Sequence, residues 1–157
     1  AAAAAPALAL ACSPGDPNRL LVGDSSDSVT HASRLGQPPP PRAYRPPRRR
    51  GWGHGASKGV REEEEKAMGG VACLAFSPFF HEYFLAGCGD GSVRLYKVKR
   101  VTAAGGTRAF VGPWPSAISS VAWSEYRPAV FFVLEASGTL HAFDLLQHSA
   151  GAVATER

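Results

Sequence analysis

The sequence predicts an all-β protein built from about three copies of a strand–turn–strand–turn–strand unit. Repetition of such units is typical of a radially repeated architecture of antiparallel sheets. Ser13, Ser77 and Ser124 each end an apolar run, and each is followed sixteen residues later by an apolar residue of a predicted third strand. The runs between these points are short and are bounded by Gly, Pro, Asn, Asp and Ser, as strands are. Units of this kind usually provide binding surfaces rather than catalytic chemistry.

The first unit covers residues 7–35. Leu8, Leu10 and Cys12 alternate with small residues, which predicts a half-buried strand. Residues 14–18 form a dense turn signal, residues 20–22 the second strand and residues 29–32 the third.

The second unit, residues 71–98, has the clearest pattern. Leu74 and Phe76 point to one face of its first strand, and we assign them to the core of the sheet. A tight hairpin turn follows the second strand, because Gly and Asp tolerate positive φ; its residues are Gly89, Asp90 and Gly91.

The third unit, residues 117–146, repeats the second. Val121 and Trp123 occupy the places of Leu74 and Phe76, so they are also assigned to the core. Ser137 and Gly138 provide the corresponding turn.

Three segments lie outside these units. Residues 36–70 are rich in Pro, Gly, Arg and Glu. They cannot bury enough apolar surface to offset the entropy of ordering, so we expect a disordered loop. Residues 99–116 are interpreted as a connector and residues 147–157 as a tail.

The charge of the chain is concentrated in one segment. Residues 36–70 hold eight basic and four acidic residues, whereas the rest of the chain holds nine of each, which accounts for the net charge of +4. The predicted units therefore have no basic face for nucleic acid.

No apolar run is long enough to span a membrane. Residues 1–11 lack the basic flank of a signal peptide. Three cysteines without CxxC spacing indicate small buried hydrophobes in a reducing compartment, the cytoplasm.

Several short motifs resemble functional sites. The glycine-rich residues 87–91 precede a strand rather than a helix, which favours a hairpin over a phosphate loop. Residues 55–59 match G-x-S-x-G without the strand and helix that a nucleophile elbow needs. The five histidines have no metal-ligand spacing. Residues 38–41 fit either a polyproline ligand or a stiff connector. Trp114 either staples neighbouring units or meets a partner. We therefore expect no enzyme activity, no metal, no cofactor and no small-molecule substrate.

Longer phrases in the three units resemble a known family. These are residues 16–23, 84–95 and 127–131, together with the pair Phe143–Asp144 that closes the third strand of the last unit. They resemble WD repeats, and in this order they are similar to the propeller of dynein intermediate chains, most of all the WD-repeat intermediate chains of cytoplasmic dynein 2. Leu134 and Glu135 stand where this pattern has a glycine after the second strand.

The resemblance implies a partial WD-repeat β-propeller of about three blades. It also implies a noncatalytic subunit that binds dynein heavy chain and other dynein subunits and supports retrograde intraflagellar transport. The expected location is the cytoplasm and cytoskeleton, including the cilium or flagellum and its base, with no membrane or nucleic-acid partner. The alternative is a generic WD-repeat scaffold or adaptor, such as one in a ubiquitin ligase. Because propellers close with about four to eight blades, three units by themselves should be marginally stable.

Overall fold

The computed structural model describes residues 5–36, 43–45, 69–98, 108–111, 116–147 and 151–157. These residues form twelve strands in three four-stranded antiparallel sheets and no helix. The strands are β1 (Ala7–Ser13), β2 (Asp16–Asp24), β3 (Val29–Ser33), β4 (Ala43–Tyr44), β5 (Val71–Phe76), β6 (Tyr83–Cys88), β7 (Ser92–Lys97), β8 (Arg108–Val111), β9 (Ile118–Trp123), β10 (Val130–Glu135), β11 (Leu140–Asp144) and β12 (Ala154–Glu156).

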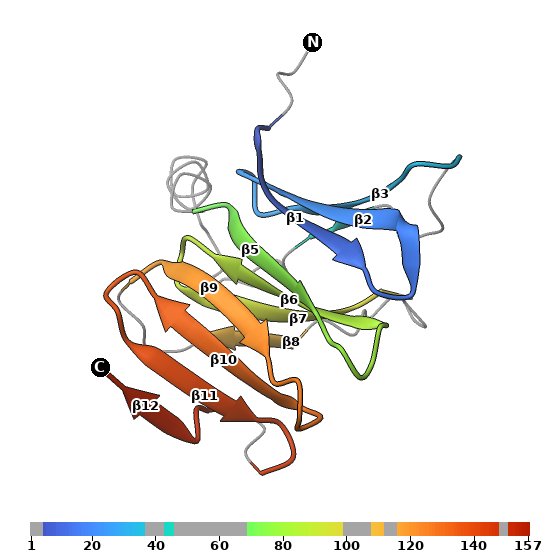
Figure 1. The fold of residues 1–157 in the computed structure, drawn as a ribbon. Coiled ribbons are helices and arrows are strands. Elements are labelled where there is room, and N and C mark those ends of the chain that lie inside the picture. Colours follow the sequence, from blue (N-terminus) through green and yellow to red (C-terminus); the bar gives the residue numbers. More distant parts are fainter. Residues whose placement is uncertain (1–4, 37–42, 46–68, 99–107, 112–115, 148–150) are drawn as a thin grey trace, which may run out of the picture.

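Each sheet is a meander whose strands pair in chain order, so each is a propeller blade. Blade 1 contains β1–β4, blade 2 contains β5–β8 and blade 3 contains β9–β12. The blades are arranged face to face, and their first strands β1, β5 and β9 lie side by side (Figure 1). This architecture confirms the predicted fold class, an all-β partial WD-repeat propeller.

The fourth strand of each blade was not predicted. β4 lies in the segment interpreted as a loop, β8 in the connector and β12 in the tail. These strands are two to four residues long, and they join the sheets through backbone pairing with β3, β7 and β11. Most of residues 36–70 lies outside the described part of the chain, so the predicted disorder there stays a prediction.

Side chains stabilise the turns between the second and third strands. Asp24 Oδ1 accepts hydrogen bonds from the N–H groups of Ser26 and Ser28, at 2.8 and 3.0 Å. Asp90 Oδ1 similarly accepts the Ser92 N–H at 2.9 Å. Such local carboxylate bonds are typical of turns that begin with Asp. They fix the corner at which blades 1 and 2 reverse direction.

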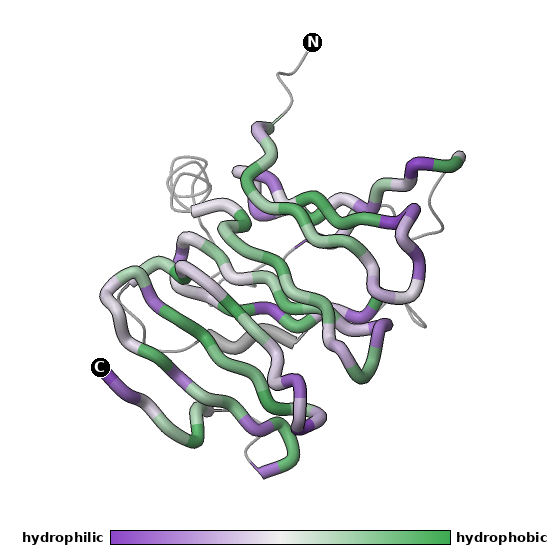
Figure 2. Tube along the Cα trace, viewed as in Figure 1, coloured by the Kyte–Doolittle hydropathy of each residue, from purple (hydrophilic) through white to green (hydrophobic). Residues whose placement is uncertain are grey.

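The hydrophobic core lies between the blades, in two clusters. Side chains on alternate positions of a strand point to opposite faces, so Phe84 joins the cluster shared with blade 1 while Leu85 joins the one shared with blade 3. Figure 2 shows the hydrophobic strands that provide these clusters. The first cluster contains Leu21, Val29, Tyr44, Val71, Phe84, Ala86, Cys88 and Tyr96. The second contains Leu85, Val93, Ile118, Val121, Phe131, Val133 and Phe143.

Glycines allow the close approach of successive blades. A Cβ atom on Gly23 would lie 2.5 Å from Val71 Cγ1 at the start of the next blade. A Cβ atom on Gly87 would likewise lie 2.7 Å from Ile118 Cγ2. Gly23 and Gly87 occupy the same register position in β2 and β6, so the same pairing of glycine with a β-branched side chain recurs at both junctions.

Candidate interaction surfaces

The sequence-predicted core residues lie at the two junctions between blades. Val121 is buried in the second cluster, and Trp123 is half-buried against it. The Trp123 indole donates a hydrogen bond to the Ala75 carbonyl of blade 2 at 3.1 Å. Leu74 and Phe76 are half-buried against the first cluster. The structure thus places each of the four on the blade face that looks toward the preceding blade.

The predicted turn residues lie between the second and third strands of blades 2 and 3. Gly91 and Gly138 both have positive φ, at 81° and 88°. Asp90 binds the backbone of the turn, as described above, and the Ser137 hydroxyl lies 3.2 Å from the Thr139 hydroxyl. Gly89 has a different constraint, because a Cβ atom there would collide with the Gly69 backbone.

Blade 3 has an uncovered apolar face on the side away from blade 2. Phe132 and Leu134 of β10 and Leu140 of β11 are 37%, 37% and 39% exposed. The strand register places Phe132 and Leu140 where blade 2 has Leu85 and Val93, both 0% exposed beneath blade 3. This face of blade 3 therefore has the chemistry of a blade junction, and none of the described blades packs on it.

Blade 1 has the complementary uncovered face. Leu10 of β1 is 64% exposed. Leu10 occupies the register position of Leu74, which packs against the preceding blade. The three blades form a stack whose two ends both expose apolar side chains.

A buried ion pair connects blade 1 to blade 2. Asp27, in the turn between β2 and β3, is fully buried, and its Oδ2 lies 3.0 Å from Arg94 Nη2 of β7. Arg94 Nη2 also lies 3.1 Å from Asp90 Oδ2. Burial favours a lower pKa for Arg94, but the neighbouring Cys88 and the bond to Asp27 raise that pKa above its ordinary value, so the guanidinium stays charged.

Asp27 was not singled out from the sequence, although a signal was present. It occupies the position of Gly91 and Gly138, and like them it has a positive φ, 60°. Asp adopts this conformation less readily than Gly. Its place in a glycine position is explained by the bond that it makes across the junction to Arg94.

Blade 3 has its own buried polar cluster, and His141 in it occupies the register position that Arg94 has in blade 2. His141 Nε2 lies 2.6 Å from Glu135 Oε1, and His141 Nδ1 lies 3.0 Å from the Thr155 hydroxyl of β12. Both His141 and Glu135 are buried. These contacts give Glu135, which departs from the glycine of the WD pattern, a structural role in fixing β11 within blade 3.

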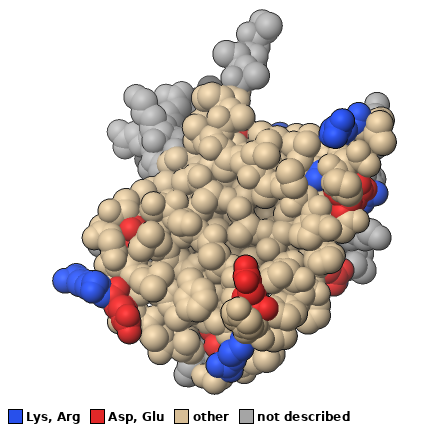
Figure 3. All heavy atoms as spheres, in the orientation of Figure 1, with Lys and Arg blue, Asp and Glu red and all other residues tan. Residues whose placement is uncertain are grey.

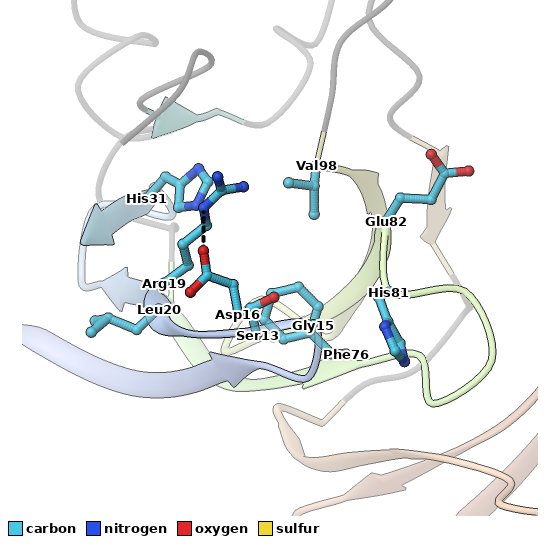
Figure 4. A pocket seen from close by; sticks show the side chains of 10 residues that line it. All are labelled: Ser13, Gly15, Asp16, Arg19, Leu20, His31, Phe76, His81, Glu82 and Val98. Atoms are coloured by element: carbon cyan, nitrogen blue, oxygen red, sulfur yellow. Dashed lines mark ion pairs between the residues drawn. The ribbon is translucent and has the colours of Figure 1, made fainter. Parts of the chain in front are cut away.

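A pocket of about 260 Å³ lies between blades 1 and 2, beside the turns that follow β1 and β5. Arg19 and Asp16 form an ion pair on one side, with 2.9 Å between Nε and Oδ2 (Figure 4). The pocket is lined by Ser13, Gly15, Asp16, Arg19, Leu20, His31, Phe76, His81, Glu82 and Val98. Its lining combines apolar side chains such as Leu20, Phe76 and Val98 with charged and histidine side chains.

The described residues do not assemble a metal site. They contain no group of three or more His, Cys, Asp or Glu residues placed to hold a metal ion. All three cysteines are free, and burial raises the pKa of Cys88 to about 12, which suppresses the reactive thiolate. No helix in this part of the chain could cross a bilayer. The candidate elbow at residues 55–59, the proline run 38–41 and Trp114 lie outside the described residues.

Comparison with known proteins gives two close matches and no matching protein-family model. The chain is 31% identical over 148 residues to cytoplasmic dynein 2 intermediate chain 1 of Mus musculus, which covers 91% of this chain and 13% of that protein. It is 31% identical over 150 residues to the Homo sapiens protein of the same name, covering 92% of this chain and 12% of that protein. The chain therefore spans about an eighth of the length of the curated relatives that it matches. Over nearly all of its length, this chain is a relative of the intermediate chains of cytoplasmic dynein 2.

Proposed function

We propose that this chain is part of a noncatalytic intermediate-chain subunit of a dynein motor complex. In this role it binds dynein heavy chain and supports retrograde intraflagellar transport in cilia. The observation that carries the proposal is the 31% identity to two dynein 2 intermediate chains over nine tenths of this chain. The location that follows is the cytoplasm and cytoskeleton, including the cilium and its base.

The blade geometry supports a binding role. The faces of neighbouring propeller blades pack against each other, so the blades present their edges and turns to a partner. The two uncovered faces, marked by Leu10 on blade 1 and Phe132 on blade 3, have the composition of blade junctions. In the proposed subunit, further blades of the same polypeptide cover both faces and complete a rigid platform.

The experiment is affinity purification of the full-length protein from ciliated cells, followed by quantitation of co-purified dynein heavy chains. The expected result is stoichiometric recovery of the dynein 2 heavy chain. A protein from which residues 71–156 have been deleted, and with them blade 2 and blade 3, is the control and should lose it. Recovery of ubiquitin-ligase subunits without any heavy chain would contradict the proposal and favour a generic WD-repeat scaffold.

Ciliary transport gives a second measurement of the same proposal. Cells that lack the protein should accumulate transport particles at ciliary tips, because retrograde movement returns them to the base. Normal return velocities and normal tip content in such cells would contradict the transport role even if heavy-chain binding were found.

A further inference from the structure

Among the described residues, five of the six exposed large hydrophobic side chains outside the strands lie at one end of the blades. Phe79 and Phe80, in the turn between β5 and β6, are 41% and 52% exposed, and Tyr126, in the turn between β9 and β10, is 89% exposed. Leu35 and Leu146 follow β3 and β11 at the same end and are 72% and 82% exposed. Turns normally carry polar residues, so this concentration needs an explanation. We name this end, defined by Leu35, Phe79, Phe80, Tyr126 and Leu146, the first-turn face.

Backbone contacts place these segments together. The Val98 N–H after β7 donates to the Glu82 carbonyl in the turn that contains Phe79 and Phe80. The Leu145 N–H after β11 donates to the Ala129 carbonyl beside the turn that contains Tyr126. Each third strand therefore ends beside the first turn of its own blade.

The first turns of neighbouring blades are adjacent as well. A Cβ atom on Gly15 of blade 1 would lie 3.3 Å from His81 Nδ1 of blade 2. Trp123 at the end of β9 bonds to Ala75 near the end of β5. The three first turns consequently form one continuous strip, and Figure 2 shows hydrophobic colour running into the turn between β5 and β6.

The opposite end of the described blades has a different composition. Its turns contain only small or polar residues, namely residues 25–28, 89–91 and 136–138. The exposed hydrophobics in the strands belong to the uncovered blade faces, as described above. The uncovered end faces of the stack therefore explain why Leu10 and Phe132 are exposed. They do not explain why Phe79, Phe80 and Tyr126 are exposed.

Positive and negative charges balance on the first-turn face, where exposed Arg34 and Glu125 add one charge of each sign to the ion pairs. Three pairs lie there: Arg19 with Asp16 at 2.9 Å, Lys97 with Glu82 at 3.4 Å, and Arg127 with Asp144 at 3.3 Å. Over the side of the molecule in Figure 3, charged side chains are few and both signs are present. A nucleic acid or an anionic membrane requires an excess of positive charge, and this face has none among its described residues.

We propose that the first-turn face docks a protein segment whose contacting side is apolar and uncharged, and that one large side chain of this segment enters the pocket between blades 1 and 2. Phe79, Phe80 and Tyr126 are the anchors, since exposed aromatic residues contribute most of the binding energy in interfaces. The pocket opens beside the same turns and is lined by Phe76 and His81. This inference rests on the proposed function in one respect, that the segment belongs to the dynein heavy chain.

The test compares two triple variants of the full-length protein. The first changes Phe79→Ser, Phe80→Ser and Tyr126→Ser; the matched control changes Phe79→Leu, Phe80→Leu and Tyr126→Phe and keeps an apolar surface. Because all three side chains are exposed, both variants should keep the thermal unfolding temperature of the unmodified protein. The serine variant should recover at least about tenfold less dynein heavy chain in affinity purification, and the control about as much as the unmodified protein.

The outcomes separate the two proposals. If the unmodified protein recovers no heavy chain, the proposed function fails. If the unmodified protein and the serine variant recover equal amounts, the function stands and the docking face is wrong.

A photo-crosslinking residue at position 126 tests the face independently of the affinity purification. A crosslink to an apolar, uncharged peptide of the dynein heavy chain, lost when Phe79 and Phe80 are Ser, supports the proposal. A crosslink within this chain or to a second copy of it overturns the proposal, as does the absence of any crosslink. Flotation with phosphatidylserine–phosphatidylcholine vesicles that depends on Phe79, Phe80 and Tyr126 would also overturn it, in favour of a membrane.

Discussion

Replacing Asp27 by glycine separates two opposing contributions to stability at the junction of blades 1 and 2. Asp27 has a φ of 60°, and the equivalent residues Gly91 and Gly138 show that glycine fits this backbone. A residue with a side chain is strained at this positive φ, and glycine is not. Removing this strain should stabilise the fold by about 1 kcal/mol. The same change removes the carboxylate that lies 3.0 Å from the buried Arg94.

The loss of the carboxylate should be the larger effect. Removing one partner of a buried ion pair costs about 3–5 kcal/mol. The lower value applies here, because Arg94 keeps Asp90 at 3.1 Å. The net destabilisation of Asp27→Gly is then about 2 kcal/mol, which corresponds to a fall of roughly 4–8 °C in unfolding temperature for a protein of this size.

The assay is thermal unfolding of the purified protein followed by circular dichroism, with Asp27→Asn as the matched control. Asn also tolerates the left-handed region, so this variant removes the charge and leaves the backbone preference nearly unchanged. Asp27→Asn should be destabilised as well. An unfolding temperature for Asp27→Gly at or above that of the unmodified protein would show that backbone strain outweighs the ion pair, and the reasoning would be refuted.

Two other predictions concern residues that the structure places in contrasting environments. In the 157-residue chain, Phe131→Ala should cost about 3–5 kcal/mol of unfolding free energy, whereas Phe132→Ala on the uncovered face should cost less than about 1 kcal/mol. In the full-length protein the two costs should converge if a further blade covers Phe132, and an unchanged difference in urea titrations would contradict that. Exposed Cys12 should react with a maleimide at neutral pH, whereas Cys88, whose pKa burial raises to about 12, should react only after unfolding. Mass spectrometry of the labelled peptides measures this, and labelling of folded Cys88 would argue against its burial.

The raised pKa of Cys88 also determines how its contribution to the stability of the fold changes with pH. The unfolded thiol ionises near its ordinary pKa of 9.0, whereas the folded thiol stays protonated to about pH 12. The contribution of Cys88 to stability is therefore complete below pH 9.0 and is lost progressively as the pH rises toward 12.

The parts of the fold that the sequence predicts are those in which local pattern and tertiary packing agree. The alternation around Leu74 and Phe76 and the glycine turn at Gly91 suffice to predict the three-stranded units. The fourth strands carry no such pattern. Ala154–Glu156, for example, is fully exposed, and it is held by backbone bonds to β11 rather than by buried side chains.

The junction between blades shows a second limit of sequence reasoning. A sequence pattern identifies which residues of a strand share a face, but it does not identify the residue of the next blade that each one meets. The pair Asp27–Arg94 joins residues 67 positions apart. Asp27 lies outside the motifs found in the sequence, and nothing in residues 84–95 marks Arg94 as its partner. A comparison of the three turns position by position would have found Asp27 as an exception to glycine. The sequence does not predict the first-turn face, because the hydrophobicity of Phe79 and Phe80 does not indicate that their side chains are exposed.

Leu134 breaks the pattern by which successive blades pack. At the two closed junctions, Gly23 and Gly87 leave room for the β-branched residues Val71 and Ile118 of the following blade. The third copy of this glycine position is Leu134, which is 37% exposed on the uncovered face of blade 3. A β-branched residue could not approach Leu134 as closely as Val71 approaches Gly23. The complementary residue of a following blade should then be small, such as Gly, Ala or Ser.

This size argument predicts the effect of Leu134→Gly in the full-length protein. If a small residue faces Leu134, the change creates a cavity and should destabilise the protein by about 3 kcal/mol or more, since the cost of a lost buried leucine adds to that of glycine in a strand. If a β-branched residue faces it, the change relieves crowding and restores the arrangement seen at Gly23 and Gly87. Urea unfolding of the full-length protein measures the difference, and stabilisation by Leu134→Gly would show that the third junction follows the same rule as the first two. In the 157-residue chain the same substitution should cost less. It should cost the glycine penalty, about 0.5–1 kcal/mol relative to Ala, and the small contribution of the partly buried Leu134 side chain, because no described blade covers that face.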